Sequence, residues 1–209
     1  MAAASSAIRR DGPLEHTMLR AMFAARKRVF VDLLKWDVPV LDGSYEIDQF
    51  DTPTATYVML IEANGEHRAS ARLLETGGPH ILSDLFPQLC NGPVPRGRET
   101  REITRFCIDP LVHRRERRLA RNQLVTSLVV HARRVGITTY TAVANLPWSE
   151  QIMRFGWNCR ELGPAIRCGG EELVALQIRI DDNTLPALRQ SGIYADEHYV
   201  ATGKPGVVS

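Results

Sequence analysis

A long amphipathic helix pattern with strand patterns on both sides constrains the fold of this chain more than any other feature. Residues 114–135 carry apolar side chains at helical spacing, and Gly136 directly after them is a helix stop signal. The apolar stripe consists of Leu124, Leu128, Val129, Ala132 and Val135. A helix of this kind buries its stripe against a sheet. We therefore expect an α/β fold, a mixed twisted sheet flanked by helices on both faces.

The other expected elements alternate around that helix. Helices are expected at residues 14–34, 83–89, 148–155 and 184–190, and strands at 56–61, 66–74, 100–108, 138–144, 157–162, 165–168 and 171–180. Asn64-Gly65 and Gly169-Gly170 predict tight hairpins. Residues 38–51 predict a long loop. This order is compatible with the acetyltransferase-like, GNAT-type fold, although the pattern alone does not single it out.

Length and composition fit one domain over residues 1–209, with loose tails expected at 1–12 and 193–209. The formal net charge of +2 is close to neutral and gives no support to a nucleic-acid partner. No apolar run reaches signal-peptide or transmembrane length, so we expect no membrane partner and a cytoplasmic location. The four cysteines form no Cys-x-x-Cys pair, which argues against a metal site. No cofactor is expected either.

Separate segments of the chain carry charged and aromatic residues that a folded core does not require. They contribute Arg26, Phe30, Trp36, Glu46, Asp48, Asp51, Arg72, Glu102, Arg105 and Phe106. Aromatic faces attract a ligand cation, and arginines fork onto carboxylates. Clustered carboxylates can hold an amine, a sulfonium or a metal, but this acidic segment lacks the glycine turn of a calcium loop. The set predicts a pocket for a zwitterionic, cationic, adenine-bearing ligand.

Taken singly, these residues have simpler explanations. Phe30 and Trp36 fit a core, and the acidic segment fits a solvated loop. Arg72 fits a structural ion pair as well as a ligand contact. Only the joint occurrence of these residues favours a binding site.

The same segments resemble the motifs of the acyl-homoserine-lactone synthases, which make the autoinducers of bacterial quorum sensing. The matching stretches are Arg26-x3-Phe30-x5-Trp36, Glu46-x-Asp48-x-x-Asp51, Ser70-Ala71-Arg72-Leu73 and Glu102-Ile103-Thr104-Arg105-Phe106. They spread over residues 14–110. Leu33 departs from the family pattern, which usually has a basic or amide residue there, and this concerns a surface contact rather than the chemistry.

The resemblance implies a two-step acyl transfer. The α-amine of S-adenosylmethionine attacks an acyl thioester on acyl carrier protein or coenzyme A, and the methionine carboxylate then closes a lactone and expels methylthioadenosine. Glu102 is the implied general base, directly or through water, and Asp48 and Arg105 complete the catalytic set. The residues implied to bind substrate are Arg26, Phe30, Trp36, Glu46, Asp51, Arg72, Phe106 and Thr141. Within this set, Asp51 and Arg72 are expected to form an ion-pair network that closes the N-terminal segment over the site.

The acyl donor raises further expectations. An apolar tunnel is expected from residues 138–144 and 174–178 together with Trp148, Met153 and Phe155. Thr141 falls where family members that prefer 3-oxo chains carry threonine. The basic run at residues 113–118 fits a solvated helix start, and it also fits docking of an acidic carrier, or of coenzyme A phosphates, at Arg114, Arg115 and Arg118.

One geometric condition follows from strand periodicity. On a regular strand, Glu102 and Arg105 point to opposite faces of the sheet. Both residues can serve one site only if a bulge intervenes between them.

Two other functions stay open at this point, and so does the oligomeric state. A different thioester-dependent N-acyltransferase of GNAT-like fold keeps the sheet and the long helix, but it does not need Arg26, Trp36 and Asp48. A nucleic-acid-binding module has only the basic run in its favour, since the chain offers no aromatic platform.

Overall fold

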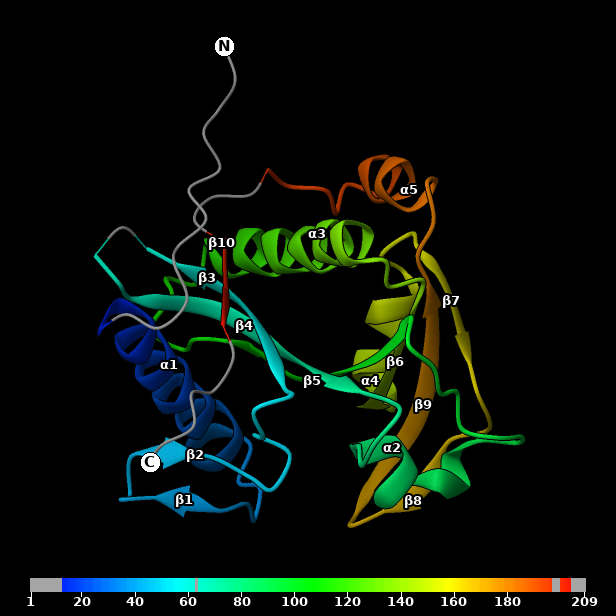
Figure 1. Ribbon diagram of the computed structural model, residues 1–209, viewed down its shortest axis with the longest axis horizontal. Helices are drawn as coiled ribbons and strands as arrows, with labels where there is room; N and C mark the ends of the chain where they lie inside the picture. Colours follow the sequence, from blue (N-terminus) through cyan, green and yellow to red (C-terminus); the bar gives the residue numbers. More distant parts are fainter. Residues whose placement is uncertain (1–12, 63, 197–199, 204–209) are drawn as a thin grey trace.

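The computed structural model describes residues 13–62, 64–196 and 200–203 (Figure 1). Over these residues eight strands form one mixed sheet in the order β10-β3-β4-β5-β6-β9-β7, with β8 paired to β9. The strands are β3 (Thr56–Ile61), β4 (His67–Glu75), β5 (Thr100–Ile108), β6 (Thr139–Asn145), β7 (Asn158–Glu161), β8 (Ile166–Cys168), β9 (Glu171–Arg179) and β10 (Val200–Gly203). Only β5 and β6 run parallel to each other, and the other described pairs are antiparallel.

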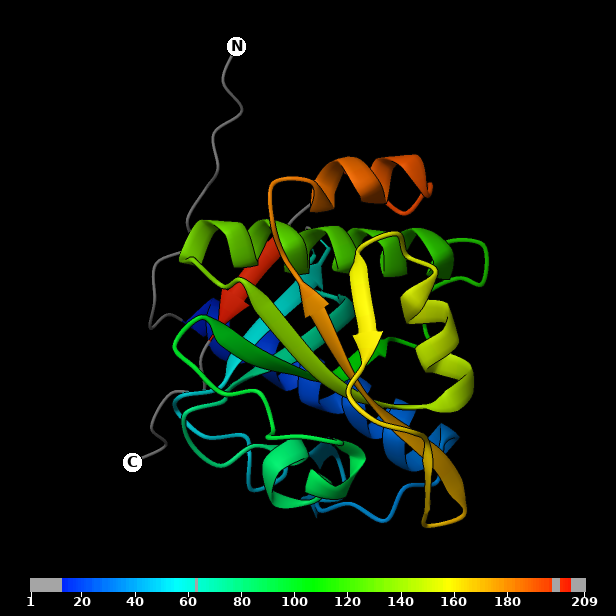
Figure 2. The same ribbon diagram turned by 90° about the vertical axis from the view of Figure 1, so that its right-hand side faces the viewer.

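Helices cover both faces of this sheet (Figures 1 and 2). One face carries α3 (Arg117–Val135), against which α5 (Thr184–Gln190) packs. The opposite face carries α1 (Pro13–Arg26), which continues directly into the π-helical segment η1 (Lys27–Leu33). The remaining short helices are α2 (Ile81–Asp84), the 3-10 turn η2 (Pro87–Leu89) and α4 (Leu146–Met153). None of the helices in the described ranges is long and apolar enough to cross a membrane.

Strand β4 shows how one stretch of sequence serves two apolar layers. Its residues Ala69, Ala71 and Leu73 alternate onto the α3 face and join a buried core with the expected apolar stripe of that helix, except for Val135, which is exposed. Leu74 belongs to the opposite layer, where it is buried together with Met22 of α1. Each fully buried aliphatic side chain of these layers contributes roughly 1.5–3 kcal/mol. The sheet is therefore held from both sides, and its strands position the residues that lie between the layers.

The sheet opens between β5 and β6. These parallel strands pair only from Thr100 to Ile103 on β5 and from Thr139 to Ala142 on β6. Both strands continue past that point, β5 to Ile108 and β6 to Asn145, without pairing to each other. Because the backbone edges that face the opening have no strand partner there, the opening can receive a ligand between the two strands.

A bulge in β5 lies at this opening. Ser70 pairs with Cys107 and Arg72 pairs with Thr104, so Arg105 and Phe106 together stand opposite one residue of β4. Arg105 has a φ of +49°, a conformation that non-glycine residues seldom adopt. The bulge therefore fulfils the condition set by strand periodicity for Glu102 and Arg105.

The structure confirms most of the expected elements, although the short helix expected at 83–89 is divided into α2 and η2. Three further details are corrected. The expected helix at 14–34 turns π-helical from Lys27 onward. The expected loop at 38–51 contains a short hairpin of β1 (Val40–Leu41) and β2 (Tyr45–Glu46), which pairs backbone groups that a plain loop leaves to water. The expected loose tail at 193–209 is wrong for β10, which pairs with the edge of β3 and so covers it. The expected tail at 1–12 lies outside the described residues.

Candidate active site

Six charged residues from distant parts of the chain form one buried ion-pair layer beside the sheet opening. They are Arg26, Glu46, Asp48, Asp51, Arg72 and Arg105. With three arginines and three carboxylates, the formal charges cancel. We call this set the charged layer. Its neutrality matters because one unpaired charge in such a place costs several kcal/mol (about 3–5).

Each arginine of the charged layer is held by two carboxylates. Arg26 forks onto Asp51 with distances of 2.7 and 2.9 Å, and its Nε donates to Glu46. Arg72 forks onto Asp48 at 2.6 and 3.0 Å and also pairs with Asp51 at 2.8 Å. Arg105 reaches Asp48 at 2.7 Å and Glu46 at 3.0 Å. These bidentate contacts fix orientation as well as charge.

The charged layer shifts the pKa values of its own members. Burial alone lowers the pKa of Arg26, but hydrogen bonds and charge from Asp51 and Glu46 outweigh it and raise that pKa. Burial alone raises the pKa of Asp51, but Arg26 and Arg72 hold it well below its usual range. The pKa of Tyr57, which donates to Asp51 at 2.7 Å, is raised by burial and by that carboxylate. Both pKa shifts favour the ionised forms of Arg26 and Asp51 at neutral pH.

An aromatic pair lies in front of the charged layer. Phe30 and Trp36 stack with ring centroids 4.8 Å apart at 27°. The Arg105 guanidinium lies 5.3 Å from the Phe30 centroid and 5.6 Å from that of Trp36. Phe30 is buried, whereas 38% of Trp36 stays exposed. Trp36 therefore offers an accessible aromatic surface to a ligand cation.

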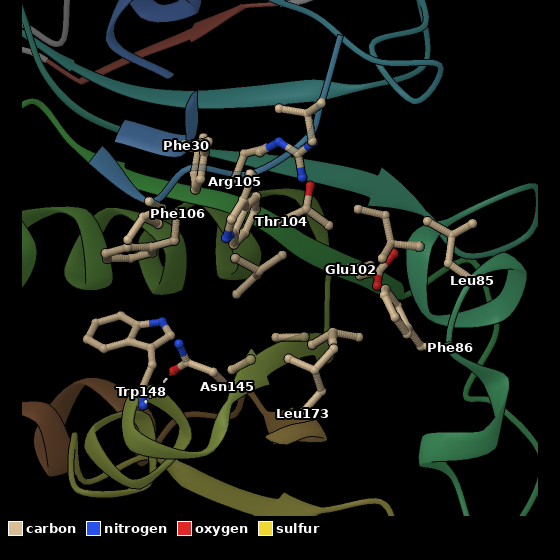
Figure 3. Close-up of a pocket in the computed structure, with 18 of the residues that line it drawn as sticks. Phe30, Leu85, Phe86, Glu102, Thr104, Arg105, Phe106, Asn145, Trp148 and Leu173 are labelled. Atoms are coloured by element: carbon tan, nitrogen blue, oxygen red, sulfur yellow. Dashed lines mark hydrogen bonds between the residues drawn. The ribbon is translucent and has the colours of Figure 1, made fainter. Parts of the chain in front are cut away.

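One pocket of about 1070 Å³ joins this aromatic pair to the sheet opening. At one end it is lined by Phe30, Trp36, Asp48 and Arg105. At the other end it is lined by apolar side chains from the α3 face, including Leu128, Trp148, Ile152, Phe155 and Trp157. Figure 3 shows Arg105, Thr104 and Glu102 on one side of the pocket and Trp148, Asn145 and Leu173 on the other. A space of this size and make-up suits an elongated ligand with a charged head and an apolar tail.

Glu102 lies on the pocket wall next to α2, on the same side of the pocket as Thr104 and Arg105 (Figure 3). Its Oε1 accepts a hydrogen bond from the backbone N–H of Leu82 at 2.8 Å, and its Oε2 has no hydrogen-bond partner among the described residues. Burial raises the pKa of Glu102 to about 7, against the opposing N–H groups of Leu82 and Ile81 and the charge of Arg72. A carboxyl group with such a pKa exchanges protons near neutrality, as a general base requires.

The bulge decides which side chains of β5 meet on one face. Arg105 joins Thr104 on the α1 side, where Thr104 accepts a hydrogen bond from Arg72 at 2.9 Å. Phe106 turns to the α3 side and packs on Trp148, with centroids 5.5 Å apart. One short stretch of β5 thus supplies both ends of the pocket.

The predicted site residues fall into two groups in the structure. Phe30, Trp36, Asp48, Glu102, Arg105 and Phe106 line the pocket. Arg26, Glu46, Asp51 and Arg72 do not line it, because they neutralise one another in the charged layer behind the wall. Their expected direct contact with substrate is therefore corrected to support of the wall, which matches the ion-pair network expected for Asp51 and Arg72.

Thr141 is a second correction. It is fully buried and does not belong to the pocket lining, while its neighbours Ala142, Val143 and Ala144 do. Thr141 stands opposite Glu102 in the parallel β5–β6 register, and its hydroxyl has no hydrogen-bond partner among the described residues. The paired stretch of the two strands therefore encloses it, away from the pocket surface.

The basic run lies apart from the pocket lining. Arg114, Arg115 and Arg118 are exposed where the chain enters α3. Arg117 differs from them, since it donates to the carbonyls of Pro110 and Val112 and so stabilises the preceding turn. Three exposed cations therefore remain for an anionic partner. Cys107 is fully buried against Ala25 and Phe30 and therefore serves packing.

Sequence reasoning missed the part of the wall that α2 and its neighbours supply. Ile81, Leu85 and Phe86 line the pocket, and the backbone of Leu82 holds Glu102. Apolar residues in a short helix give no signal that separates a pocket wall from a core. Gln49 and Asp37 also line the pocket, and the sequence predicted only a long loop at residues 38–51 in this region.

Comparison with known proteins decides the family. The model of the family described as "Autoinducer synthase" matches residues 12–188 of this chain. The chain belongs to the autoinducer synthase family. An acyl-homoserine-lactone synthase of Ralstonia nicotianae is 33% identical over 185 residues, which cover 85% of this chain and 89% of that protein.

Solved structures of acyl-homoserine-lactone synthases have the same fold. The CoA-dependent synthase MesI superposes with a TM-score of 0.76 at 28% identity and covers 88% of this chain and 92% of that one. TofI, in a ternary complex with an inhibitor and MTA, superposes with a TM-score of 0.73 at 30% identity, covering 87% and 94%. The predicted GNAT-like fold is confirmed. This autoinducer synthase is an acyltransferase that makes N-acyl-homoserine lactone signals for quorum sensing.

Proposed function

We propose that this synthase binds S-adenosylmethionine at the aromatic and charged end of the pocket and the acyl chain at its apolar end. The observation that carries this assignment is Glu102 on the wall of this pocket, which has a pKa of about 7 and a carboxylate oxygen without a hydrogen-bond partner among the described residues. The sulfonium of S-adenosylmethionine suits the accessible face of Trp36. Its ammonium suits the carboxylates of Asp48 and Glu102.

The first step forms the amide. Glu102, directly or through a water molecule, takes a proton from the ammonium so that the nitrogen lone pair becomes available. The amine nitrogen attacks the thioester carbon, the C–N bond forms and the C–S bond breaks. The thiol leaves with the second proton that the nitrogen loses. Charge gathers on the thioester oxygen in the transition state. Backbone N–H groups at the bulge of Arg105 and Phe106 are the proposed donors to it.

The second step closes the lactone and needs mainly positioning. An oxygen of the methionine carboxylate attacks its own γ-carbon, a C–O bond forms, and the bond from that carbon to the sulfonium breaks. The sulfur leaves as neutral methylthioadenosine, so no acid or base has to act. Arg105 holds the aromatic pair and the acidic loop in place during this step.

The carrier of the acyl group is the open part of this proposal. The exposed cations Arg114, Arg115 and Arg118 suit both an acidic acyl carrier protein and the phosphates of coenzyme A. MesI, one of the similar structures, is CoA-dependent. We propose an acyl thioester donor docked at this basic run, and parallel assays with both carriers identify it.

The test is a reconstitution with purified full-length protein. S-adenosylmethionine is incubated with a panel of acyl-coenzyme A thioesters and with the same acyl groups on acyl carrier protein, and methylthioadenosine and lactone are quantified. Equimolar release of both products that requires a thioester supports the proposal. Acylation of another amine without methylthioadenosine contradicts it. Charge reversal at Arg114 and Arg115 is expected to raise KM for the true donor and to leave KM for S-adenosylmethionine unchanged.

A further inference from the structure

A second ion pair attaches η1 to the sheet outside the pocket. Arg28, the second residue of η1, donates from Nε to Oδ1 of Asp109 at 3.2 Å and from Nη2 to Oδ2. Asp109 directly follows β5, so the contact joins positions 81 residues apart in the chain. The Asp109 side chain is 2% exposed and that of Arg28 is 32% exposed.

Hydrogen bonds to neighbouring segments hold Asp109 in place. Its backbone N–H donates to the carbonyl of Arg68 on β4 at 2.9 Å, and its Oδ1 accepts from the N–H of Leu111 at 3.0 Å. The backbone of Asp109 is therefore bonded to β4, and its carboxylate is bonded to the turn that leads to α3. Arg28 connects η1 to this junction.

Arg28 is the cation that balances the buried carboxylate. The Nδ1 of His67 lies 3.6 Å from Asp109, but burial lowers the pKa of His67 and keeps the ring neutral at neutral pH. Burial alone raises the pKa of Asp109, yet the neighbouring His67 and Arg28 hold it well below its usual range. Asp109 is thus ionised, and the charge opposite it comes from η1.

The same helical segment also carries Phe30 of the aromatic pair, and Trp36 follows shortly after its end. Phe30 follows Arg28 by two residues, is buried on Ala25 and Cys107, and carries the stacked Trp36. The N–H of Leu34 bonds to the carbonyl of Val29, the five-residue spacing of a π-helix, a geometry that is frequent at functional sites. Segment η1 therefore meets the β5 region twice, through Arg28 and Asp109 outside the pocket and through the aromatic pair and Arg105 inside it.

We propose that the Arg28–Asp109 pair is a positioning clamp for S-adenosylmethionine. It fixes the start of η1 so that Phe30 and Trp36 present their rings at the right distance from Arg105. This inference rests on the proposed binding of S-adenosylmethionine at the aromatic pair. Neither clamp residue lines the pocket, so the clamp acts through η1 and not through contact with substrate.

Arg28→Gln tests the clamp, with Arg68→Gln as the matched control. Arg68 pairs with Glu62, which directly follows β3, at 3.0 Å, and neither Glu62 nor its other partner Glu116 belongs to η1. We expect Arg28→Gln to weaken S-adenosylmethionine binding about tenfold in calorimetry and to raise its KM similarly. KM for the best thioester of the panel and the binding constant of Arg68→Gln are expected to stay within about twofold of the parent.

The double variant Arg28→Gln/Asp109→Asn separates positioning from stability. Neutralising Asp109 removes the unpaired buried carboxylate that Arg28→Gln leaves, so the melting temperature is expected to recover. Binding of S-adenosylmethionine is expected to stay weak, because the tie to η1 is still absent. Recovery of binding together with stability overturns the proposal, and so does parent-like binding by Arg28→Gln.

Trp36→Ala shows which inference fails. If Trp36→Ala weakens S-adenosylmethionine binding and Arg28→Gln does not, only the clamp is refuted. If neither change affects binding, S-adenosylmethionine does not use the aromatic pair, and the proposed placement of the substrate falls together with the clamp.

Discussion

The charged layer behind one end of the pocket and the apolar wall at the other end are stabilised by different kinds of contact. In the charged layer, Arg26, Arg72 and Arg105 each bridge two carboxylates in fixed, directional geometry. At the apolar wall, Phe155 and Trp148 contact each other edge to face, with centroids 5.9 Å apart, among aliphatic neighbours. The first arrangement depends on residue identity and the second mainly on volume.

This difference has a functional consequence. A site that accepts one invariant substrate is served by a wall that cannot be rebuilt by single substitutions, and the charged layer supports such a wall at the end of the pocket proposed for S-adenosylmethionine. An apolar wall can be reshaped without loss of folding, so the acyl end is the one free to change its selectivity.

The largest expected effect comes from Glu102→Gln. The amide keeps the shape of the side chain and can still accept from Leu82, but it cannot take a proton, so kcat is expected to fall by about 10²–10⁴-fold. Release of methylthioadenosine measures the loss. Glu75→Gln is the control, because Glu75 lies exposed at the end of β4 and pairs with Arg101. A near-parent kcat for Glu102→Gln refutes the general base and leaves the two ends of the pocket without a catalytic link.

The second effect concerns stability and compares the two ends directly. Asp51→Asn removes the carboxylate that Arg26 and Arg72 both contact and leaves the charged layer with one unbalanced positive charge, so the free energy of unfolding is expected to fall by about 3–5 kcal/mol. Ile152→Val at the apolar wall is expected to cost only about 0.5–1.5 kcal/mol. Urea denaturation measures both values. Equal losses contradict the claim that the charged layer depends on residue identity more than the apolar wall does.

The same contrast explains how far the sequence alone could lead. Arg26, Asp48, Asp51, Arg72 and Arg105 are recognisable because charged residues at fixed spacings seldom serve a core, and the structure does bring them together. Their division into lining and supporting residues was not predictable, since it depends on which guanidinium meets which carboxylate in space. The apolar wall was predicted only in part, because a wall and a core use the same residue types.

The bulge and the π-helical segment mark a second limit of sequence reasoning. The need for a bulge followed from the spacing of Glu102 and Arg105, but its place at Arg105 and Phe106 depends on the register with β4. The π-helical turn of η1 left no pattern in the sequence that distinguishes it from an α-helix. Both deviations shift side chains by one residue, and both carry residues of the pocket wall.

A pair of tryptophan variants sharpens the comparison of the two ends. Trp36→Ala removes the accessible aromatic face and is expected to raise KM for S-adenosylmethionine about tenfold, with little effect on the thioester. Trp148→Ala removes the ring that packs on Phe106 and is expected to show the reverse pattern. Each variant serves as the control of the other in steady-state assays with both substrates varied. Equal effects on both KM values contradict the division of the pocket into two ends.

The smallest expected effect concerns the pH dependence of catalysis. Since Glu102 has a pKa of about 7 and acts only when deprotonated, kcat/KM is expected to rise as the pH increases through about 7. The negative charge of Asp84 adds to the raised pKa, so Asp84→Asn is expected to move this acid limb to lower pH, on the order of a few tenths of a unit. Asp182→Asn removes the same charge next to Arg133 on α3 and is expected to leave the limb in place. If the rise of kcat/KM with pH shifts equally in both variants, the shift reflects the net charge of the protein and not the pKa of Glu102. The general base is then another residue of the pocket wall.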